Sequence, residues 1–199
     1  MEKIILIGGA PTVGKSYAAR KISEQLGFPW ISTDIIREMM RELVNKKDYS
    51  NLFLHSTGIT AQKYLTKYSA KQIVGNQNKE SRDVWRGVKA LIKTDYVWKS
   101  FIIEGVAILP DVVKKIMKKD ERIKPVFLYN GSREKIKKVI FTRGLWDDAE
   151  KYSDSLKYKE VEWVLLYDDW IKKQAKKYNL PLVDATDTAG CIKKIKTLI

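Results

Sequence analysis

A glycine-rich segment near the N-terminus carries the residues best suited to phosphate chemistry. It fits the pattern G-x-x-x-x-G-K-[ST] and reads Gly9-Ala10-Pro11-Thr12-Val13-Gly14-Lys15-Ser16. The glycines let the backbone wrap closely around an anion, and the helix expected to begin here adds its positive end. Lys15 can bridge the β- and γ-phosphates, and the Ser16 hydroxyl can ligate magnesium. The segment from Gly9 to Tyr17 therefore predicts a site for ATP or another nucleoside triphosphate with Mg²⁺.

Two carboxylates follow later apolar runs and could act beside this segment. Asp34 could take the proton from an acceptor hydroxyl, or hold that hydroxyl in line with the γ-phosphate. The alternative for Asp34 is an ordinary helix N-cap. Glu104 ends an apolar run at the position where an acid often holds Mg²⁺ or its water, and Gly105 is expected to leave room for a ligand. The alternative for Glu104 is a strand-end carboxylate in solvent.

Arginines are the candidates for contacts with negative charge on the substrates. Arg37 and Arg41 lie one turn apart and could grip an acidic group on the acceptor, or could form a solvated helix face. Arg143 precedes Gly144 and an acidic, aromatic stretch typical of a lid. From there it could stabilise the charge on a transferring phosphoryl group. Arg133, at the start of the same predicted helix, is equally consistent with a surface residue.

The elements that must position these side chains alternate between strands and helices. Short apolar runs predict strands at 3–7, 28–31, 101–103, 125–129 and 180–183. Helical spacing and start signals predict helices at 14–26, 32–43, 60–74, 82–92, 111–118, 132–143, 158–178 and 189–198, with a loop at 75–76. This order predicts a three-layer α/β/α fold with a five-stranded, mostly parallel sheet. Such sheets bind ligands beyond the carboxyl ends of their strands, where each candidate residue is expected.

We expect a single domain over residues 1–199, with a helical acceptor-binding region at about 35–98 and a helical lid at about 143–157. Within the acceptor-binding region an apolar stripe is expected to face the core, formed by Ile36, Met39, Met40 and Leu43. His55 is the only histidine, so histidines cannot build a metal site. The tryptophans Trp146, Trp163 and Trp170 are expected to serve packing.

Composition excludes several classes of protein. With 44% hydrophobic residues in 199 the chain is not a disordered polyelectrolyte, and it has no apolar run long enough to cross a membrane. Its one cysteine, Cys191, excludes an internal disulfide and fits a cytoplasmic location. The net charge of +14 attracts small anionic substrates and leaves nucleic acid open as a partner, although most lysines lie on predicted helices as solvated faces.

Three stretches together resemble the 2-phosphoglycerate kinase family: residues 5–16, 31–41, and 102–106 with Pro110. Residues 141–143 also resemble that family's lid arginine segment. The resemblance implies an adenylate-kinase-like P-loop NTPase fold, ATP with Mg²⁺, and transfer to the hydroxyl of 2-phosphoglycerate. It also implies that Asp34 meets this hydroxyl, while Arg37 and Arg41 meet the carboxylate and phosphate. Two departures are Ala107, where the family often has histidine, and Tyr17, where Thr or Ser usually stands.

Two other functions remain open from the sequence. The first is a kinase for another small molecule, such as a nucleoside, nucleotide, sugar or antibiotic, which a panel of acceptors would identify. The second is an RNA-binding or regulatory NTPase that uses the basic surface. RNA affinity that falls steeply with salt would support this second function.

Overall fold

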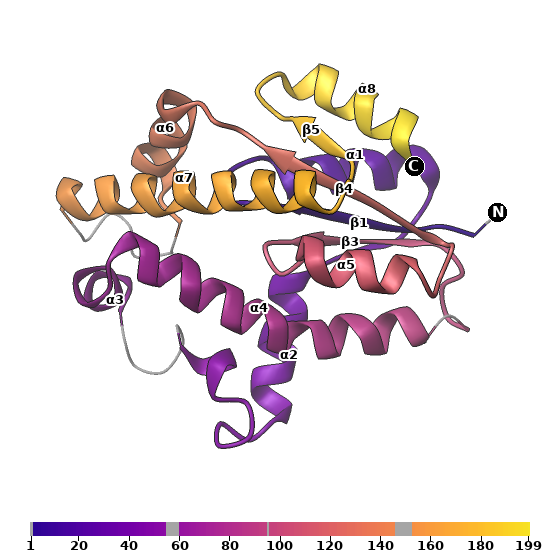
Figure 1. Ribbon diagram of the computed structural model, residues 1–199, viewed down its shortest axis with the longest axis horizontal. Helices are drawn as coiled ribbons and strands as arrows, with labels where there is room; N and C mark the ends of the chain where they lie inside the picture. Colours follow the sequence, from indigo (N-terminus) through magenta and orange to yellow (C-terminus); the bar gives the residue numbers. More distant parts are fainter. Residues whose placement is uncertain (1, 55–59, 95, 146–152) are drawn as a thin grey trace.

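The computed structural model describes residues 2–54, 60–94, 96–145 and 153–199 (Figure 1). Five strands lie in the order β2-β3-β1-β4-β5, and every neighbouring pair is parallel. The strands are β1 (Ile4–Gly9), β2 (Trp30–Ser32), β3 (Phe101–Gly105), β4 (Ile123–Tyr129) and β5 (Leu182–Asp184). The predicted five-stranded parallel sheet is therefore confirmed.

Helices cover both faces of the sheet and give the predicted three layers (Figure 1). Helices α1 (Lys15–Leu26) and α8 (Thr188–Leu198) pack on one face, and α5 (Pro110–Met117) and α7 (Asp154–Lys177) on the other. The remaining elements are α2 (Thr33–Leu43), the 3-10 helix η1 (Ser50–Phe53), α3 (Ala61–Lys67), α4 (Ala70–Lys93) and α6 (Arg133–Arg143). Within the described ranges, no helix combines the length and the apolar composition that a membrane span would need.

The sheet brings the ends of three strands to one edge. Strand β1 is buried along its whole length, as expected for a central parallel strand covered on both faces. Its Ile7 pairs with Glu104 of β3, and Glu104 in turn pairs with Ser32 of β2. The loop after β1, the start of α2 and the end of β3 consequently meet above the same sheet edge, which is where the candidate residues were expected.

The start of α2 decides between the two interpretations of Asp34. Ser32 is the N-cap, and its hydroxyl accepts a hydrogen bond of 3.1 Å from the backbone N–H of Asp34. Asp34 therefore lies inside the first turn, and the N-cap interpretation of its carboxylate is wrong. The Asp34 carboxylate does not act as the cap, because the Ser32 hydroxyl already accepts a hydrogen bond from a backbone N–H at this end of the helix.

The middle of the chain differs from the prediction. The expected helix at 60–74 is interrupted, because α3 ends at Lys67 and a capping box between Ser69 and Gln72 starts a new helix. Helix α4 then continues to Lys93 with no loop at 75–76. A glycine in a helix interior costs about 1 kcal/mol, and the long buried face of α4 outweighs that penalty at Gly75.

Helix α2 does not bury the whole apolar stripe that was predicted for it. Ile36 is buried, and both Ile36 and Met40 pack closely against Gly87 of α4, where a Cβ would come within 2.8 Å of each. Met39 and Leu43 are instead 56% and 83% exposed. The buried carboxylate of Glu80 on α4 pairs with Arg41, so the arginine side of α2 also faces α4 and Met39 and Leu43 lie on the opposite side.

Part of the predicted lid lies outside the described residues, namely 146–152, and so do His55 and Trp146. Helix α7 begins at Asp154 inside the predicted lid range. Trp163 is buried and Trp170 is partly buried against the core, in agreement with the expected packing role.

Candidate active site

The phosphate-binding loop connects β1 directly to α1. Gly14 has φ +90°, a left-handed conformation that glycine adopts without strain, and α1 begins at the next residue. At Gly9 a Cβ would lie 2.6 Å from the carbonyl oxygen of Leu128 on β4, so only glycine fits there. Thr12 also has a positive φ of 68°, which is uncommon for a residue with a side chain and is typical of a functional loop.

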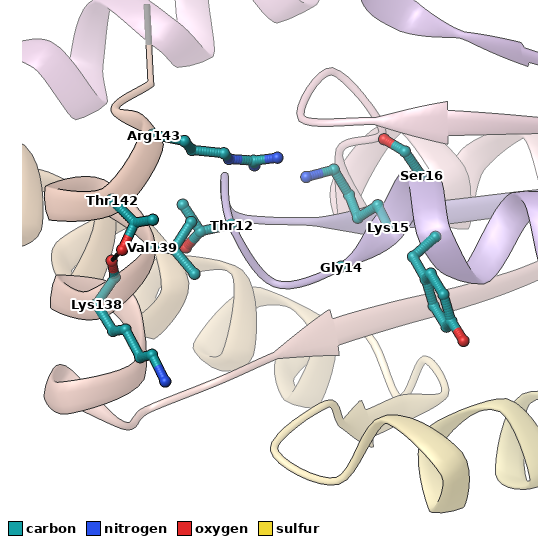
Figure 2. A pocket seen from close by; sticks show the side chains of 9 residues that line it. Thr12, Gly14, Lys15, Ser16, Lys138, Val139, Thr142 and Arg143 are labelled. Atoms are coloured by element: carbon teal, nitrogen blue, oxygen red, sulfur yellow. Dashed lines mark hydrogen bonds between the residues drawn. The ribbon is translucent and has the colours of Figure 1, made fainter. Parts of the chain in front are cut away.

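Lys15 and Arg143 direct their charged ends at the same space. Lys15 is buried and its Nζ donates a hydrogen bond of 2.8 Å to the carbonyl oxygen of Ala10. Figure 2 shows the ends of Lys15 and Arg143 pointing toward one another, from the loop and from the end of α6. Burial lowers the pKa of Lys15, against the opposing effects of Glu104 and Asp34, and Arg143 lowers it further. Two cations that face each other in this way favour an anion between them.

Ser16 and Glu104 form the second pair at this edge. The Ser16 hydroxyl donates a hydrogen bond of 3.0 Å to Oε1 of Glu104, whose side chain is buried. Burial raises the pKa of the Glu104 carboxyl, while Lys15 and the Ser16 hydrogen bond lower it. The interpretation of Glu104 as a solvent-exposed carboxylate is therefore wrong.

The Ser16–Glu104 pair fits Mg²⁺, because hydroxyl and carboxylate oxygens are the hard ligands that this ion prefers. The described residues contain no group of three or more His, Cys, Asp or Glu side chains that could hold a metal ion. A magnesium ion in such a site would be held largely by substrate phosphates and water, with few protein ligands.

Gly105 is needed for a different reason from the one expected. Its φ is +151°, and a Cβ there would collide with the hydroxyl of Thr33 and lie 2.8 Å from that residue's Cβ. The space beside Gly105 is thus filled by Thr33 rather than left for a ligand. The glycine allows the end of β3 to approach the start of α2, which brings Glu104 close to Asp34.

Asp34 and Arg37 are joined on the exposed side of α2. Nη1 of Arg37 donates a hydrogen bond of 2.9 Å to Oδ1 of Asp34, and its Nε donates one of 3.0 Å to Oε1 of Glu38. Asp34, Glu80 and Glu38 raise the pKa of Arg37 above its ordinary value, although burial, the largest single influence, lowers it. The predicted proton acceptor and the predicted anion-binding group therefore lie in contact.

Arg41 has a structural environment that neither sequence interpretation foresaw. Its side chain is only 10% exposed, and its Nη2 donates a hydrogen bond of 2.7 Å to Oε1 of Glu80 on α4. Its Nη1 bonds Glu38 at 2.7 Å, and its Nε bonds the carbonyl oxygen of Leu52 at 2.6 Å. Arg41 is therefore not on a solvated face. Its hydrogen bonds join α2 to α4 and η1.

Two cavities meet at the phosphate-binding loop. The α6 cavity has a volume of about 480 Å³ and is drawn in Figure 2; its lining consists of Thr12, Gly14, Lys15, Ser16, Tyr17, Lys138, Val139, Thr142 and Arg143. The α2 cavity has a volume of about 630 Å³, and its lining consists of Pro11, Thr12, Lys15, Ser16, Asp34, Arg37, Gln77, Glu104, Val106, Arg143, Gly144, Leu145 and Trp163. The residues common to both are Thr12, Lys15, Ser16 and Arg143.

The structure brings most of the predicted site residues together, but not all. Ala10 and Val13 are buried beneath the loop and shape it from below. Arg133 begins α6, at the opposite end of the helix from Arg143, and lines neither cavity. Its interpretation as a surface residue is the one that fits, because the side chain is exposed.

Several lining residues were missed by the sequence analysis. Lys138, Val139 and Thr142 lie within a turn and a half of Arg143 on α6, so helical periodicity around that arginine could have found them. Gln77 and Trp163 line the α2 cavity from the middle of α4 and α7. Nothing in their local sequence signalled this, because their position depends on how these long helices pack.

Comparison with curated proteins finds similarity to 2-phosphoglycerate kinases of archaea. The chain is 29% identical to the one from Methanocaldococcus jannaschii over 98% of its length, and 28% identical to the one from Methanothermobacter thermautotrophicus over 96%. The resemblance seen in the sequence is thereby confirmed. The chain spans 62% and 63% of the length of these two relatives. No family model matches the chain.

Among solved structures, two shikimate kinases share the fold. The one from Bacteroides thetaiotaomicron has a TM-score of 0.55 at 15% identity, with 100% of this chain and 97% of that one covered. The one from Aquifex aeolicus has a TM-score of 0.50 at 17% identity, with 98% and 94% covered. These likenesses confirm the three-layer α/β/α fold.

Proposed function

We propose that this chain is an ATP-dependent phosphotransferase that moves the γ-phosphoryl group onto a hydroxyl of a small acidic metabolite. The observation that carries this proposal is the meeting of two cavities at Lys15, Ser16 and Arg143. A transfer between two bound molecules needs two binding spaces that share one point, with positive charge at that point. The similarity to archaeal 2-phosphoglycerate kinases supports the same activity.

In this proposal the α6 cavity receives the nucleotide. Backbone N–H groups of the loop and the positive end of α1 bind the phosphates, and Lys15 leaves its bond with Ala10 to contact the β- and γ-phosphates. Ser16 and Glu104 would hold Mg²⁺, which neutralises phosphate charge when it is bound. Arg143 stabilises the charge that spreads over the oxygens of the transferring group.

The α2 cavity receives the acceptor. Asp34 holds the acceptor hydroxyl in line with the γ-phosphate and takes its proton, while Arg37 binds an anionic group on the same molecule. Positioning and charge neutralisation provide most of the catalysis in phosphoryl transfer, so one such carboxylate is sufficient. Arg41 has no role in acceptor binding in this proposal, because its donor groups are bonded to Glu38, Glu80 and Leu52.

For the acceptor itself we propose 2-phosphoglycerate. The cavity walls supply Arg37, Lys15 and Arg143, which suit a molecule with more than one negative charge. The named activity of the relatives agrees with this choice.

The test is transfer from γ-labelled ATP to a panel of 2-phosphoglycerate, 3-phosphoglycerate, glycerate, shikimate, nucleosides and sugars. We expect labelled product with 2-phosphoglycerate, dependent on Mg²⁺ and absent in Lys15→Ala. Transfer to another member alone would replace the acceptor and leave the kinase proposal in place. Failure of calorimetry to detect binding of Mg²⁺ and ATP would overturn the kinase proposal as a whole.

A further inference from the structure

Thr12 lies where the two cavities meet, and the proposed function leaves it without a role. It is one of the four residues that line both cavities, together with Lys15, Ser16 and Arg143. The other three each take part in the proposed transfer. Thr12 is partly buried in the loop between β1 and α1 (Figure 2). Its side chain therefore borders the point where a phosphoryl group would pass from one cavity to the other.

The hydroxyl of Thr12 has no hydrogen-bond partner within the part of the chain that the structure describes, and its oxygen is buried. Bulk water therefore does not satisfy it in this orientation. The Ser16 hydroxyl differs, because it donates a hydrogen bond of 3.0 Å to Glu104. A buried polar group without a partner lowers the stability of a fold, so its presence calls for a reason.

The backbone of Thr12 carries a second cost. Its φ of +68° is left-handed, which is unfavourable for a residue with a branched Cβ. The other positive-φ positions of this loop are occupied by glycines, Gly9 and Gly14. A glycine at position 12 would remove both the backbone strain and the unsatisfied hydroxyl. Two independent costs at one residue beside the reaction point indicate that the hydroxyl has a function there.

We propose that Thr12 is a further catalytic residue, whose hydroxyl donates a hydrogen bond to an oxygen of the γ-phosphoryl group during transfer. This proposal rests on the proposed function and adds a neutral donor to the cations Lys15 and Arg143. Rotation about the Cα–Cβ bond moves the hydroxyl between staggered positions, from its buried position into the cavities. No existing hydrogen bond of this hydroxyl has to break for that rotation.

The hydroxyl of Thr12 keeps its own proton during the reaction. The acceptor oxygen forms a bond to the γ-phosphorus, the bond from that phosphorus to the bridging oxygen breaks, and ADP leaves with the electron pair. The proton of the acceptor passes to Asp34. Thr12 thus stabilises negative charge on the transferring group as a hydrogen-bond donor and does not act as an acid. Since ADP lacks this group, Thr12 should have little influence on the binding of ADP.

The first experiment is Thr12→Val, which keeps the branched shape of the side chain and removes the hydroxyl. We expect kcat/KM for ATP, at saturating 2-phosphoglycerate, to fall roughly 30-fold, as for a hydrogen bond to a charged group. Calorimetry should give a Kd for Mg²⁺-ADP within about twofold of wild type, because the lost contact involves only the γ-phosphoryl group. Thr66→Val, the same chemical change at an exposed position of α3, is the matched control and should leave both quantities unchanged.

Three outcomes with Thr12→Val would overturn the proposal. The first is a wild-type kcat/KM for ATP. The second is binding of Mg²⁺-ADP weakened as much as transfer, which would show that the side chain only shapes the loop. The third is a lower kcat/KM for 2-phosphoglycerate with that for ATP unchanged, which would place the hydroxyl against the acceptor.

Two further variants separate the hydroxyl from the shape of the loop. Thr12→Ser keeps the hydroxyl and should retain kcat/KM for ATP within about threefold of wild type. Thr12→Gly lacks the hydroxyl but suits a positive φ, so it should lose as much kcat/KM as Thr12→Val while its Tm is no lower than that of wild type. A serine variant as impaired as valine, or an active glycine variant, would contradict the proposal even if Thr12→Val does not fold.

The two proposals fail in different ways. A wild-type chain that transfers phosphate to no member of the acceptor panel contradicts the proposed function, and the role of Thr12 falls with it. A wild-type chain that phosphorylates 2-phosphoglycerate, with Thr12→Val and Thr12→Gly equally efficient toward ATP, contradicts the role of Thr12 alone.

Discussion

The two cavities are built in different ways, although they share Lys15, Ser16 and Arg143. The α6 cavity is lined by two segments of the chain, the phosphate-binding loop with the start of the helix after it, and the C-terminal half of α6. Besides the loop residues and Arg143, the α2 cavity is lined by side chains on four further elements, α2, α4, β3 and α7.

The charges also differ between the two sides. In the α6 cavity, Lys15 and Arg143 point at the same space and repel each other until an anion arrives. In the α2 cavity, Arg37 is already paired with Asp34 and Glu38. An acceptor anion must therefore replace existing ion pairs, so part of its interaction energy is offset. Under the proposed function, this difference favours strong binding of any triphosphate on the α6 side and discrimination between acceptors on the α2 side.

The largest effect is expected on the nucleotide side. Lys15→Ala removes one of the two convergent cations, so kcat/KM for transfer should fall by about 10³-fold, the usual consequence of losing one group that stabilises the transition state. Steady-state kinetics with labelled ATP measures this. Lys21→Ala, on the same helix but outside the cavities, should leave the rate unchanged. A Lys15→Ala enzyme with even a tenth of wild-type activity would contradict the role of the loop.

Asp34→Asn tests whether the Asp34 carboxylate takes the proton from the acceptor hydroxyl. The substitution keeps the shape of the side chain and removes the carboxylate that acts as the base. We therefore expect kcat to fall by roughly 10²-fold while Kd for Mg²⁺-ATP is unchanged. Glu38→Gln is the control, because Glu38 is the other carboxylate bonded to Arg37 on α2. If both variants lose the same activity, the effect belongs to the placement of Arg37 and not to proton transfer.

Substitution of Arg37 should weaken acceptor binding, whereas substitution of Arg41 should lower the stability of the fold. Arg37→Ala removes a charged contact from the cavity and should raise KM for 2-phosphoglycerate roughly 30-fold, as for a hydrogen bond to a charged group. Arg41→Ala removes the guanidinium that lies 2.7 Å from the buried Glu80 carboxylate, and it should lower the free energy of unfolding by about 3 kcal/mol. Urea denaturation and acceptor titration measure the two quantities. The opposite pattern would show that Arg41 faces the acceptor.

The smallest effect is expected for Asp168 of α7, whose charge acts on Lys15 of the phosphate-binding loop. Its carboxylate accepts hydrogen bonds of 3.1 and 3.2 Å from the backbone N–H of Asn130, and burial raises its pKa to about 6. Between its ordinary pKa of 3.8 and about 6 the folded chain holds this proton more tightly than the unfolded chain does. The ionisation of Asp168 therefore reduces stability as pH rises through that window.

The Asp168→Asn side chain keeps an oxygen that can accept the hydrogen bond from the backbone N–H of Asn130, but it does not ionise. Relative to wild type, its free energy of unfolding should increase by about 2 kcal/mol between pH 4 and pH 7. Urea denaturation at a series of pH values measures this, with Glu162→Gln on the exposed side of the same helix as the control. A difference that does not change with pH would show that the burial of Asp168 does not govern its titration.

The fold and the nucleotide side could be predicted from the sequence because their signals are local. The run from Ile4 to Ile7 predicts a central strand, and Gly9, Gly14, Lys15 and Ser16 have fixed positions in one motif. The burial of Glu104 at the end of β3 follows the same local logic. Where local signals were weak, as at Gly75, tertiary packing overrode the predicted loop.

The acceptor side could be predicted only in part, since Arg37 and Arg41 look alike on a helix. Their roles separate because Glu80, nearly forty positions later in the chain, bonds Arg41 at 2.7 Å and lies farther from Arg37. The same carboxylate explains why Met39 and Leu43 face outward, against the predicted stripe. The role of Gly105 was also misread, because the hydroxyl that fills its space belongs to Thr33 on another element.

The sequence by itself determined that a polyphosphate-binding loop follows a buried strand, because backbone conformation and adjacent residues are sufficient to form that anion site. Only the tertiary structure decided that Arg37 lines the α2 cavity while Arg41 does not, and that Gln77 joins the wall of that cavity. Those outcomes depend on the packing of α4 against α2, which places one ionised carboxylate between two guanidinium groups and an amide. Local sequence does not record a contact between side chains that lie on different helices.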